Sequence, residues 1–178
     1  AGLSDEVDHL TALVDDLLHL ARADAADAAA VRRPVDLDDI VLDEARRIGG
    51  SSEIEIDLSA MSAAHLDGDP NQLRRMVRNI LANAERHAAK RVSVTLRESI
   101  GRGITLTVTD DGPGIDPGDR ERVFERFVRL DAARTRHDGG TGLGLAIARD
   151  IAERHGGAIT LDDVSDGSGA RFVVTLPN

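Results

Sequence analysis

The segment 104–115, ITLTVTDDGPGI, constrains the fold more than any other part of the sequence. Ile104, Leu106 and Val108 alternate with threonines, which is the pattern of a β-strand with one buried face. Asp110 continues the same register, so a carboxylate falls on the apolar side, where an unpaired charge is costly. The Gly-Pro-Gly that follows allows a tight turn and a close approach of a ligand to the backbone. The segment predicts a strand that ends either in a binding site or in a solvated Asp-Gly turn.

A second glycine-rich segment favours the binding site. Residues 139–147, GGTGLGLAI, lead into an apolar helix pattern. Backbone amides at the N-terminus of a helix attract phosphate groups. The segment is not a Walker A loop, because no Gly-Lys-Ser/Thr follows, and it lacks the βαβ surroundings of a dinucleotide fingerprint. Together, the two glycine-rich segments predict a site for a phosphate-bearing ligand.

Composition is that of an ordinary folded domain and excludes several kinds of site. The chain has 178 residues, which is enough for one domain and an appendage. It contains no cysteine, so disulfides and thiolate metal sites are excluded. Its formal net charge of −10 argues against a nucleic-acid partner. No apolar run approaches the ~20 residues that a membrane-spanning helix needs.

The clearest helix signals lie at Pro70–His87. Asp69 suits the N-cap, Pro70 suits the first helical position, and Gln72 would complete an Asp-x-x-Gln capping box. The helix has an apolar stripe that we expect to face the core: Leu73, Met76, Val77, Ile80, Leu81 and Ala84.

A polar stripe borders the apolar one on this helix. With ~100° of rotation per residue, Asn79, Asn83 and Arg86 stack about a quarter turn from the core stripe. Their two amides and one guanidinium could line a pocket wall or form an ordinary polar flank.

Further elements follow from the two periodicities of the sequence. We predict strands at residues 35–37, 54–58, 64–66, 92–96, 158–161 and 170–176, and helices at 38–48 and 143–154.

The first thirty residues carry a separate pattern. Apolar residues recur at alternating spacings of four and three: Leu3, Val7, Leu10, Val14, Leu17 and Ala21. This is the seam of a coiled coil or a four-helix bundle, and such a helix cannot bury its stripe alone. It is either a dimerisation helix, which we prefer, or a helix folded onto its own domain.

The glycine-rich and asparagine segments together resemble a known family. Residues 110–114 (DDGPG), 140–144 (GTGLG), 79–87 (NILANAERH) and 123–129 (VFERFVR) resemble four sequence boxes of the catalytic ATP-binding domain of bacterial sensor histidine kinases. The boxes occur in the family's order, and the resemblance runs from about Pro34 to the C-terminus. It places the chain in the wider superfamily of gyrase, mismatch-repair and heat-shock ATPases.

The resemblance implies roles for the asparagine segment and the first glycine box. Asn83 corresponds to the residue that coordinates Mg²⁺, with Asn79 assisting. Arg86 corresponds to a phosphate-contacting cation, and His87 to a residue that covers the adenine ring. The remaining correspondences are Asp110 with the acid that reads the adenine amine, and Gly112 and Gly114 with glycines that pass close to the base.

The second glycine box and the phenylalanine box complete the implied site. The residues implied to bind the ATP phosphates are Gly140, Thr141, Gly142, Leu143 and Gly144. Residues 116–138 are too long for a plain connection and are interpreted as a lid, anchored by Phe124 and Phe127. Arg129, and with less support Arg126, would contact phosphate or dock the partner helix.

The resemblance also implies an architecture. The expected fold class is α/β, a two-layer sandwich in which a mixed sheet of about five strands carries helices on one face, preceded by an N-terminal helix. Residues 1–30 would be the second helix of a dimerisation and phosphoacceptor hairpin, 31–34 a linker, and 35–178 the catalytic domain. His9 and His19 lack the following acid that marks the acceptor histidine, so the acceptor helix is expected to be absent from this chain.

The expected activity is transfer of the ATP γ-phosphate to a histidine, the first step of two-component signalling. ATP and Mg²⁺ would be the cofactors, and the partners would be the acceptor helix, a response regulator and a second copy of the parent kinase. The domain would be cytoplasmic and its parent anchored in the cell membrane, and the fragment alone would not phosphorylate itself. Two alternatives are an ATP-hydrolysing conformational switch and a nucleotide-binding module without chemistry. An amide at Asn79 cannot act as a general base, which disfavours hydrolysis.

Overall fold

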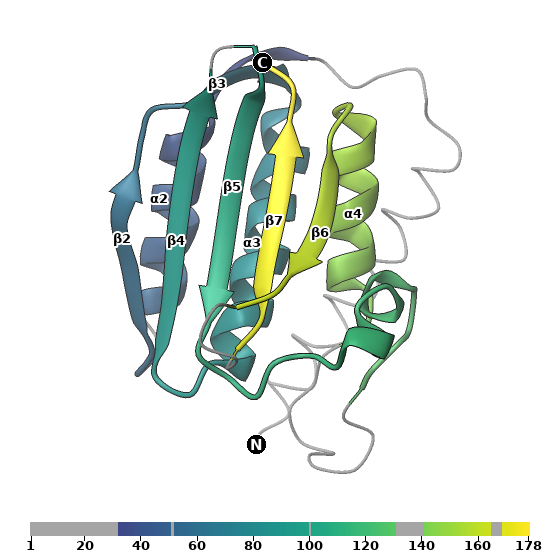
Figure 1. Ribbon diagram of the computed structural model, residues 1–178. Helices are drawn as coiled ribbons and strands as arrows, with labels where there is room; N and C mark the ends of the chain where they lie inside the picture. The colour runs from purple at the N-terminus through teal and green to yellow at the C-terminus, as the bar shows by residue number, and fades with distance from the viewer. Residues whose placement is uncertain (1–31, 51, 100, 131–140, 165–168) are drawn as a thin grey trace, which may run out of the picture.

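The structure is a computed structural model that describes residues 32–50, 52–99, 101–130, 141–164 and 169–178. The helix predicted at residues 1–30 lies outside these ranges. The described part has two layers, a sheet and the helices packed on one of its faces (Figure 1). This confirms the predicted α/β sandwich.

The elements follow one another along the chain with short connections. They are β1 Arg33–Asp36, α2 Leu37–Gly49, β2 Glu55–Met61, β3 His65–Gly68, α3 Pro70–His87, β4 Arg91–Ser99, β5 Gly103–Asp110, the short 3₁₀ turns η1 Pro117–Asp119 and η2 Arg122–Phe124, α4 Gly144–Arg154, β6 Ala158–Asp162 and β7 Arg171–Leu176. Strand β1 begins at Arg33, inside the range that the sequence suggested as a linker, and ends one residue earlier than predicted.

The main sheet is mixed, with strand order β2-β4-β5-β7-β6. Strand β2 runs parallel to β4, and the remaining neighbours are antiparallel. Strand β5 is central, and its register sets Val92 opposite Asp110 at the end where the glycine-rich turn begins. A separate antiparallel pair, β1 with β3, was not predicted as a pair.

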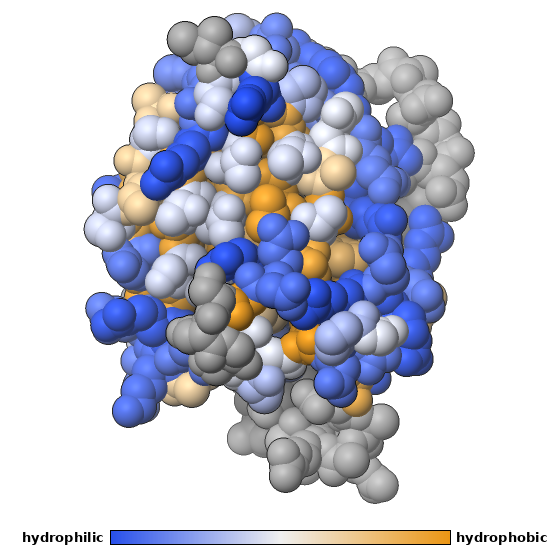
Figure 2. All heavy atoms as spheres, in the orientation of Figure 1, coloured by the Kyte–Doolittle hydropathy of each residue, from blue (hydrophilic) through white to orange (hydrophobic). Residues whose placement is uncertain are grey.

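The two faces of the sheet differ in composition. The inward side chains of β4 and β5 are apolar and buried against the helices: Val92, Val94, Leu96, Ile104, Leu106 and Val108. The alternate positions are half-buried hydroxyl residues: Ser93, Thr95, Thr105, Thr107 and Thr109. Figure 2 shows the face that carries them, where pale spheres lie among orange ones in the upper centre and blue, hydrophilic spheres lie along the margin. This is the alternation expected of a sheet with one covered face.

Helix α3 begins and ends where the sequence predicted, but its N-terminus is capped differently. The Asp69 carboxylate accepts hydrogen bonds from the backbone N–H groups of Asn71 (2.8 Å) and Gln72 (3.2 Å), as an N-cap should. The other half of the predicted capping box, in which the Gln72 side chain would accept the Asp69 N–H, is wrong. The Asp69 N–H donates instead to Nε2 of His155 (3.1 Å), a buried residue at the end of α4.

The core lies between the helices and the sheet, and α3 supplies its six predicted apolar residues. A buried carboxylate, Glu44 on α2, joins α2 to α3 by accepting hydrogen bonds from Arg47 Nε (3.0 Å) and Arg78 Nε (3.0 Å). Burial raises the pKa of Glu44, but the hydrogen bonds from Arg78 and Arg47 outweigh that effect and hold it below the ordinary value. Within the described ranges, no helix combines the length and apolarity that crossing a membrane would need.

Candidate functional site

The site is built around Asp110 at the end of β5. Its side chain is buried, with 3% of the residue exposed. Oδ1 accepts hydrogen bonds from the backbone N–H groups of Gly112 (3.0 Å) and Ala170 (3.3 Å). Oδ2 is buried and has no hydrogen-bond partner. Burial raises the pKa of Asp110 despite the opposing effects of these two bonds and of nearby His87. The carboxylate therefore retains an acceptor for a ligand.

The neighbouring Asp111 is placed in the opposite way. Its side chain is exposed, and Oδ1 accepts the backbone N–H groups of Ala89 (2.8 Å), Lys90 (3.0 Å) and Arg91 (3.1 Å). These bonds, that from Lys90 first, hold the pKa of Asp111 below its ordinary value. Asp111 thus ties the end of β5 to the connection between α3 and β4. Sequence reasoning missed this role, because the three donors lie some twenty residues away in the chain.

The first glycine turn passes close to the C-terminus of α3. A Cβ atom added to Gly112 would lie 2.2 Å from the His87 carbonyl oxygen, so the backbones alone require glycine there. Gly114 has a φ of 78°, a left-handed conformation that favours glycine. The turn therefore lies against His87, the last residue of α3.

Helix α3 presents its polar stripe along the border of the core, as predicted. Asn79 and Asn83 are half-buried, and Arg86 and His87 are exposed. Asn79 Nδ2 is buried without a hydrogen-bond partner. A Cβ added to Gly144 would lie 3.7 Å from Asn79 Cγ, which puts the first residue of α4 next to this amide. Asn79 Nδ2 is thus a second buried polar atom without a hydrogen-bond partner, after Asp110 Oδ2, and this favours the stripe as the wall of a pocket.

The second glycine box forms the turn that enters α4. Gly142 adopts a φ of 69°, and the Leu143 N–H donates to Thr141 Oγ1 (3.2 Å). Leu143 itself is buried, contributing its side chain to the core. It is the N-cap residue and makes no side-chain cap bond to the first-turn amides of α4, which are the groups that attract an anion at a helix N-terminus. Gly140 lies outside the described residues.

The two phenylalanines of the third box are placed differently. Phe124 is 6% exposed and packs edge-to-face on Phe172, with ring centroids 6.4 Å apart, as an anchor should. The prediction that Phe127 is also a buried anchor is wrong, since it is 63% exposed. Its φ of 65° lets its N–H donate to the Gly142 carbonyl (2.9 Å) while its side chain points outward.

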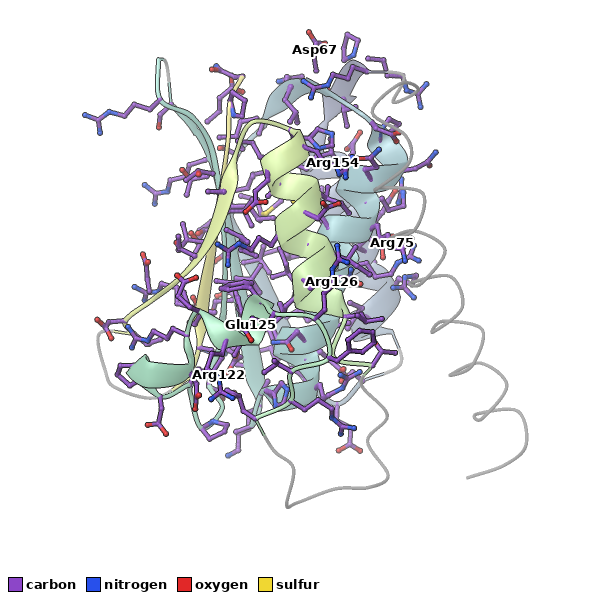
Figure 3. All side chains as sticks on the ribbon, turned by 90° about the vertical axis from the view of Figure 1, so that its right-hand side faces the viewer. Asp67, Arg75, Arg122, Glu125, Arg126 and Arg154 are labelled. Carbon is purple, nitrogen blue, oxygen red and sulfur yellow. The ribbon has the colours of Figure 1, made fainter. Side chains whose placement is uncertain are left out.

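The arginines near this box are exposed. Figure 3 shows Arg122, Glu125 and Arg126 on the segment that contains the short turns, near the N-terminal end of α4. Arg126 and Arg129 are both exposed. Residues 131–138 of the predicted lid lie outside the described ranges.

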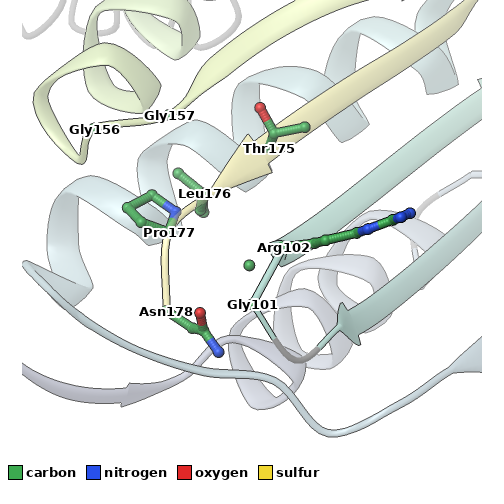
Figure 4. A pocket seen from close by; sticks show the side chains of 9 residues that line it. Gly101, Arg102, Gly156, Gly157, Thr175, Leu176, Pro177 and Asn178 are labelled. Carbon is green, nitrogen blue, oxygen red and sulfur yellow. The ribbon is translucent and has the colours of Figure 1, made fainter.

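A hollow of about 390 Å³ lies at the opposite end of β5 from Asp110 (Figure 4). It is lined by Gly101, Gly103, Gly156, Gly157 and neighbouring residues. Within the described ranges, the buried polar side-chain atoms that lack a partner belong to Asn79, Asp110 and Arg120, and none of these residues lines the hollow. The chemistry therefore favours the Asp110 end as the functional site.

The chain is similar to known proteins both in sequence and in structure. A family model described as histidine kinase-, DNA gyrase B- and HSP90-like ATPase matches residues 68–178. The chain is 36% identical to the sensor-like histidine kinase SenX3 of Mycolicibacterium smegmatis over 176 residues, covering 97% of this chain and 46% of that protein. It is 36% identical to the signal transduction histidine-protein kinase/phosphatase MprB of Mycolicibacterium paratuberculosis, covering 99% of this chain and 34% of that protein. The chain thus spans less than half the length of these relatives.

Two solved structures resemble it closely. The mycobacterial sensor histidine kinase MprB superposes with a TM-score of 0.74 at 34% identity, covering 82% of this chain and 97% of that one. Full-length ShkA in complex with AMPPNP superposes with a TM-score of 0.80 at 32% identity, covering 97% of this chain and 36% of that one.

Proposed function

Because the chain belongs to the family of histidine kinase-, DNA gyrase B- and HSP90-like ATPases, we propose that it transfers the ATP γ-phosphate to a histidine as the ATP-binding catalytic part of a sensor kinase in two-component signalling. The observation that carries the proposal is the pair of orphaned polar atoms, Asp110 Oδ2 and Asn79 Nδ2, between β5, α3 and the start of α4. Buried polar atoms are rarely left without a partner, so a polar ligand is the simplest completion of this site.

Asp110 would recognise the adenine. An ionised carboxylate only accepts hydrogen bonds, and its free Oδ2 matches the donor that the exocyclic amine of adenine offers. The exposed His87 would lie over the ring at the edge formed by Gly112 and Gly114.

The phosphates would lie between α3 and α4. Amides at the start of α4, from Gly142 to Gly144, would bind them together with Arg86, while Asn83 and Asn79 would hold Mg²⁺. Mg²⁺ prefers oxygen ligands, and when bound it neutralises charge on the phosphates. The described ranges contain no cluster of three or more acids and histidines that could hold a metal by itself, so the ion would depend on the nucleotide. We expect Asn83→Ala to remove the Mg²⁺ dependence of ATP binding, and a variant titration that Mg²⁺ still shifts would contradict this role.

The acceptor would be a histidine on a helix of the parent kinase. Arg129, with Arg126, would contact the phosphate or dock that helix. Residues 1–30 would belong to the dimerisation hairpin, the parent would be a membrane-anchored homodimer, and a response regulator would receive the phosphate. Hydrolysis by a conformational switch is the rival function, and the amide of Asn79 disfavours it because an amide cannot deprotonate water.

The proposal is tested with γ-labelled ATP and Mg²⁺. The chain is incubated alone and with a separately made dimerisation hairpin that carries an acceptor histidine. Acid-labile label on the hairpin, and none on the chain alone, is the expected result. Free phosphate without protein label would contradict the proposal in favour of an ATPase. Binding without either product would leave a nucleotide-binding module.

A further inference from the structure

Arg149, on the second turn of α4, contacts the segment that joins the two glycine boxes. Its Nη1 lies 3.2 Å from Glu121 Oε2, and its Cζ lies 5.6 Å from the centre of the Phe124 ring. A third contact, from Nε to Glu153 Oε1 (3.1 Å), stays within α4. The guanidinium thus bridges α4 to the turn η2 through one ion pair and one cation–π contact.

These contacts close a ring of interactions around the second glycine box. From Phe124 the chain runs to Phe127, whose N–H donates to the Gly142 carbonyl (2.9 Å). Gly142 leads into α4, which carries Arg149. A Cβ added to Gly142 would lie 3.0 Å from the Phe127 backbone, so the two segments touch closely. The ring of interactions therefore includes Gly142 and the start of α4, whose amides would bind the phosphates under the proposed function.

The backbone on the Phe127 side of this contact needs support. Phe127 and Gly142 both adopt left-handed φ values, 65° and 69°, and a non-glycine residue adopts that conformation only when its surroundings hold it there. Phe127 is largely exposed, so its own side chain supplies little of that support. The buried Phe124 and the exposed ion pair between Arg149 and Glu121 are two contacts that tie the same segment to the rest of the domain.

We propose that Arg149 is a positioning residue for nucleotide binding, which holds the segment 121–127 against α4 and thereby fixes the amides of the second glycine box toward the phosphates. This inference rests on the proposed function for the identity of the ligand. The inference predicts different effects on the two parts of the nucleotide. The ring of interactions includes the second glycine box, which would bind the phosphates, and it does not include Asp110, which would bind the adenine. Loss of Arg149 weakens binding of the phosphates and spares recognition of adenine.

The experiment reverses the charge of Arg149 and then exchanges the charges of Arg149 and Glu121. Calorimetry measures the affinity of each variant for two ligands, ATP with Mg²⁺ and adenosine. Arg149→Glu places like charges together, and we expect ATP affinity to fall about tenfold, with adenosine affinity within about twofold of the wild type. Exchanging both charges, in Arg149→Glu with Glu121→Arg, restores the ion pair but not the cation–π contact with Phe124, and is therefore expected to return ATP affinity to within about threefold of the wild type rather than fully. Arg149→Met, which keeps an aliphatic stem over Phe124, is the second variant if the reversal does not fold.

Asp150→Asn is the matched control, since it removes an ion pair with Arg154 within the same helix and contacts no part of the ring. It is expected to leave both affinities unchanged. Equal loss of ATP and adenosine in the Arg149 variants, or an exchange that does not recover ATP affinity, would overturn the inference. If the wild-type chain binds ATP but phosphorylates no hairpin, the proposed function is refuted. The inference about Arg149 is not refuted by that result, because the ATP and adenosine affinities of the variants can still be compared.

Discussion

The two ends of the α3–α4 pair use their buried polar groups differently. At one end, His155 donates from Nδ1 to the Ile151 carbonyl (2.8 Å) and accepts the Asp69 N–H at Nε2, so both ring nitrogens are used. Toward the other end, Asn79 Nδ2 and Asp110 Oδ2 are buried without partners. The first arrangement fixes the two helices to each other, and the second leaves hydrogen-bonding capacity for a ligand. We therefore expect stability and ligand binding to depend on opposite ends of the same helices.

Asp110→Asn is expected to show the largest effect, on binding. The amide keeps an acceptor for Gly112 and Ala170, but it lacks the charge that would attract the adenine amine. Hydrogen bonds to charged groups contribute about 1.5–3 kcal/mol, so we expect ATP affinity to fall by roughly tenfold to a hundredfold. Calorimetry measures the affinity, and the thermal unfolding midpoint confirms the fold. Wild-type affinity in a folded variant would sink the assignment of Asp110 to adenine.

His155→Leu tests the other end and should act on stability. It leaves the part-buried Asp69 N–H without its acceptor, which costs about 1 kcal/mol of unfolding free energy. Urea unfolding measures this loss, while ATP affinity of the folded variant should change by less than about threefold. His65→Leu is the matched control, because His65 is exposed on β3 and should cost far less. A loss of ATP affinity without a loss of stability would break the comparison between the two ends.

Asp111→Ala sharpens the contrast with its neighbour. Its carboxylate caps three backbone N–H groups in the manner of a helix N-cap, so we expect a loss of about 1 kcal/mol in unfolding free energy with little change in ATP affinity. Because the folded pKa of Asp111 is depressed, this contribution is present above the unfolded pKa and disappears as the pH falls through the folded pKa. Urea unfolding at neutral and at acidic pH measures the loss of unfolding free energy and its pH dependence. Equal destabilisation by Asp111→Ala at both pH values would contradict the capping role of the Asp111 carboxylate.

The raised pKa of Asp110 predicts the smallest effect, a pH dependence of binding. Acidification protonates the free carboxyl at a higher pH than an ordinary Asp, so ATP affinity should fall as the pH decreases through that raised pKa. In the free domain the same shift means that stability decreases as the pH rises through the folded pKa. Titrations from about pH 7.5 down to about pH 4, near the ordinary pKa of Asp, measure the affinity. Asp110→Asn is the control, because it removes the ionisable group at this position and leaves the phosphates of ATP unchanged, and parallel profiles for both proteins would refute the prediction.

Local signals were sufficient for much of the fold. Helix α3 was predicted to the residue, because Asp69 and Pro70 mark its start and the apolar stripe gives its length. Strand β5 followed from strict alternation, and the mixed sheet with helices on one face followed from the resemblance.

Long-range contacts and unusual backbone angles escaped prediction. The Asp69–His155 hydrogen bond joins residues 86 positions apart, and the sequence pattern offered Gln72 as a nearer partner. Phe127 resembled its neighbour Phe124, but its left-handed backbone turns the side chain outward, and no propensity predicts that angle for phenylalanine. At the site, the residue types were readable from the sequence, whereas the orphaned atoms of Asn79 and Asp110 became visible only in three dimensions.

The most direct test of the difference between the two ends is a titration of the isotope-labelled chain with ATP and Mg²⁺, followed by backbone amide NMR. We predict that the largest shifts occur at Gly112, Gly142 and Gly144, and that the amides of Asp69, Gly156 and Gly157 stay in place. Shifts concentrated at Gly156 and Gly157, beside the hollow at the far end of β5, would contradict the account and move the nucleotide site to the end where the buried histidine is fully hydrogen-bonded.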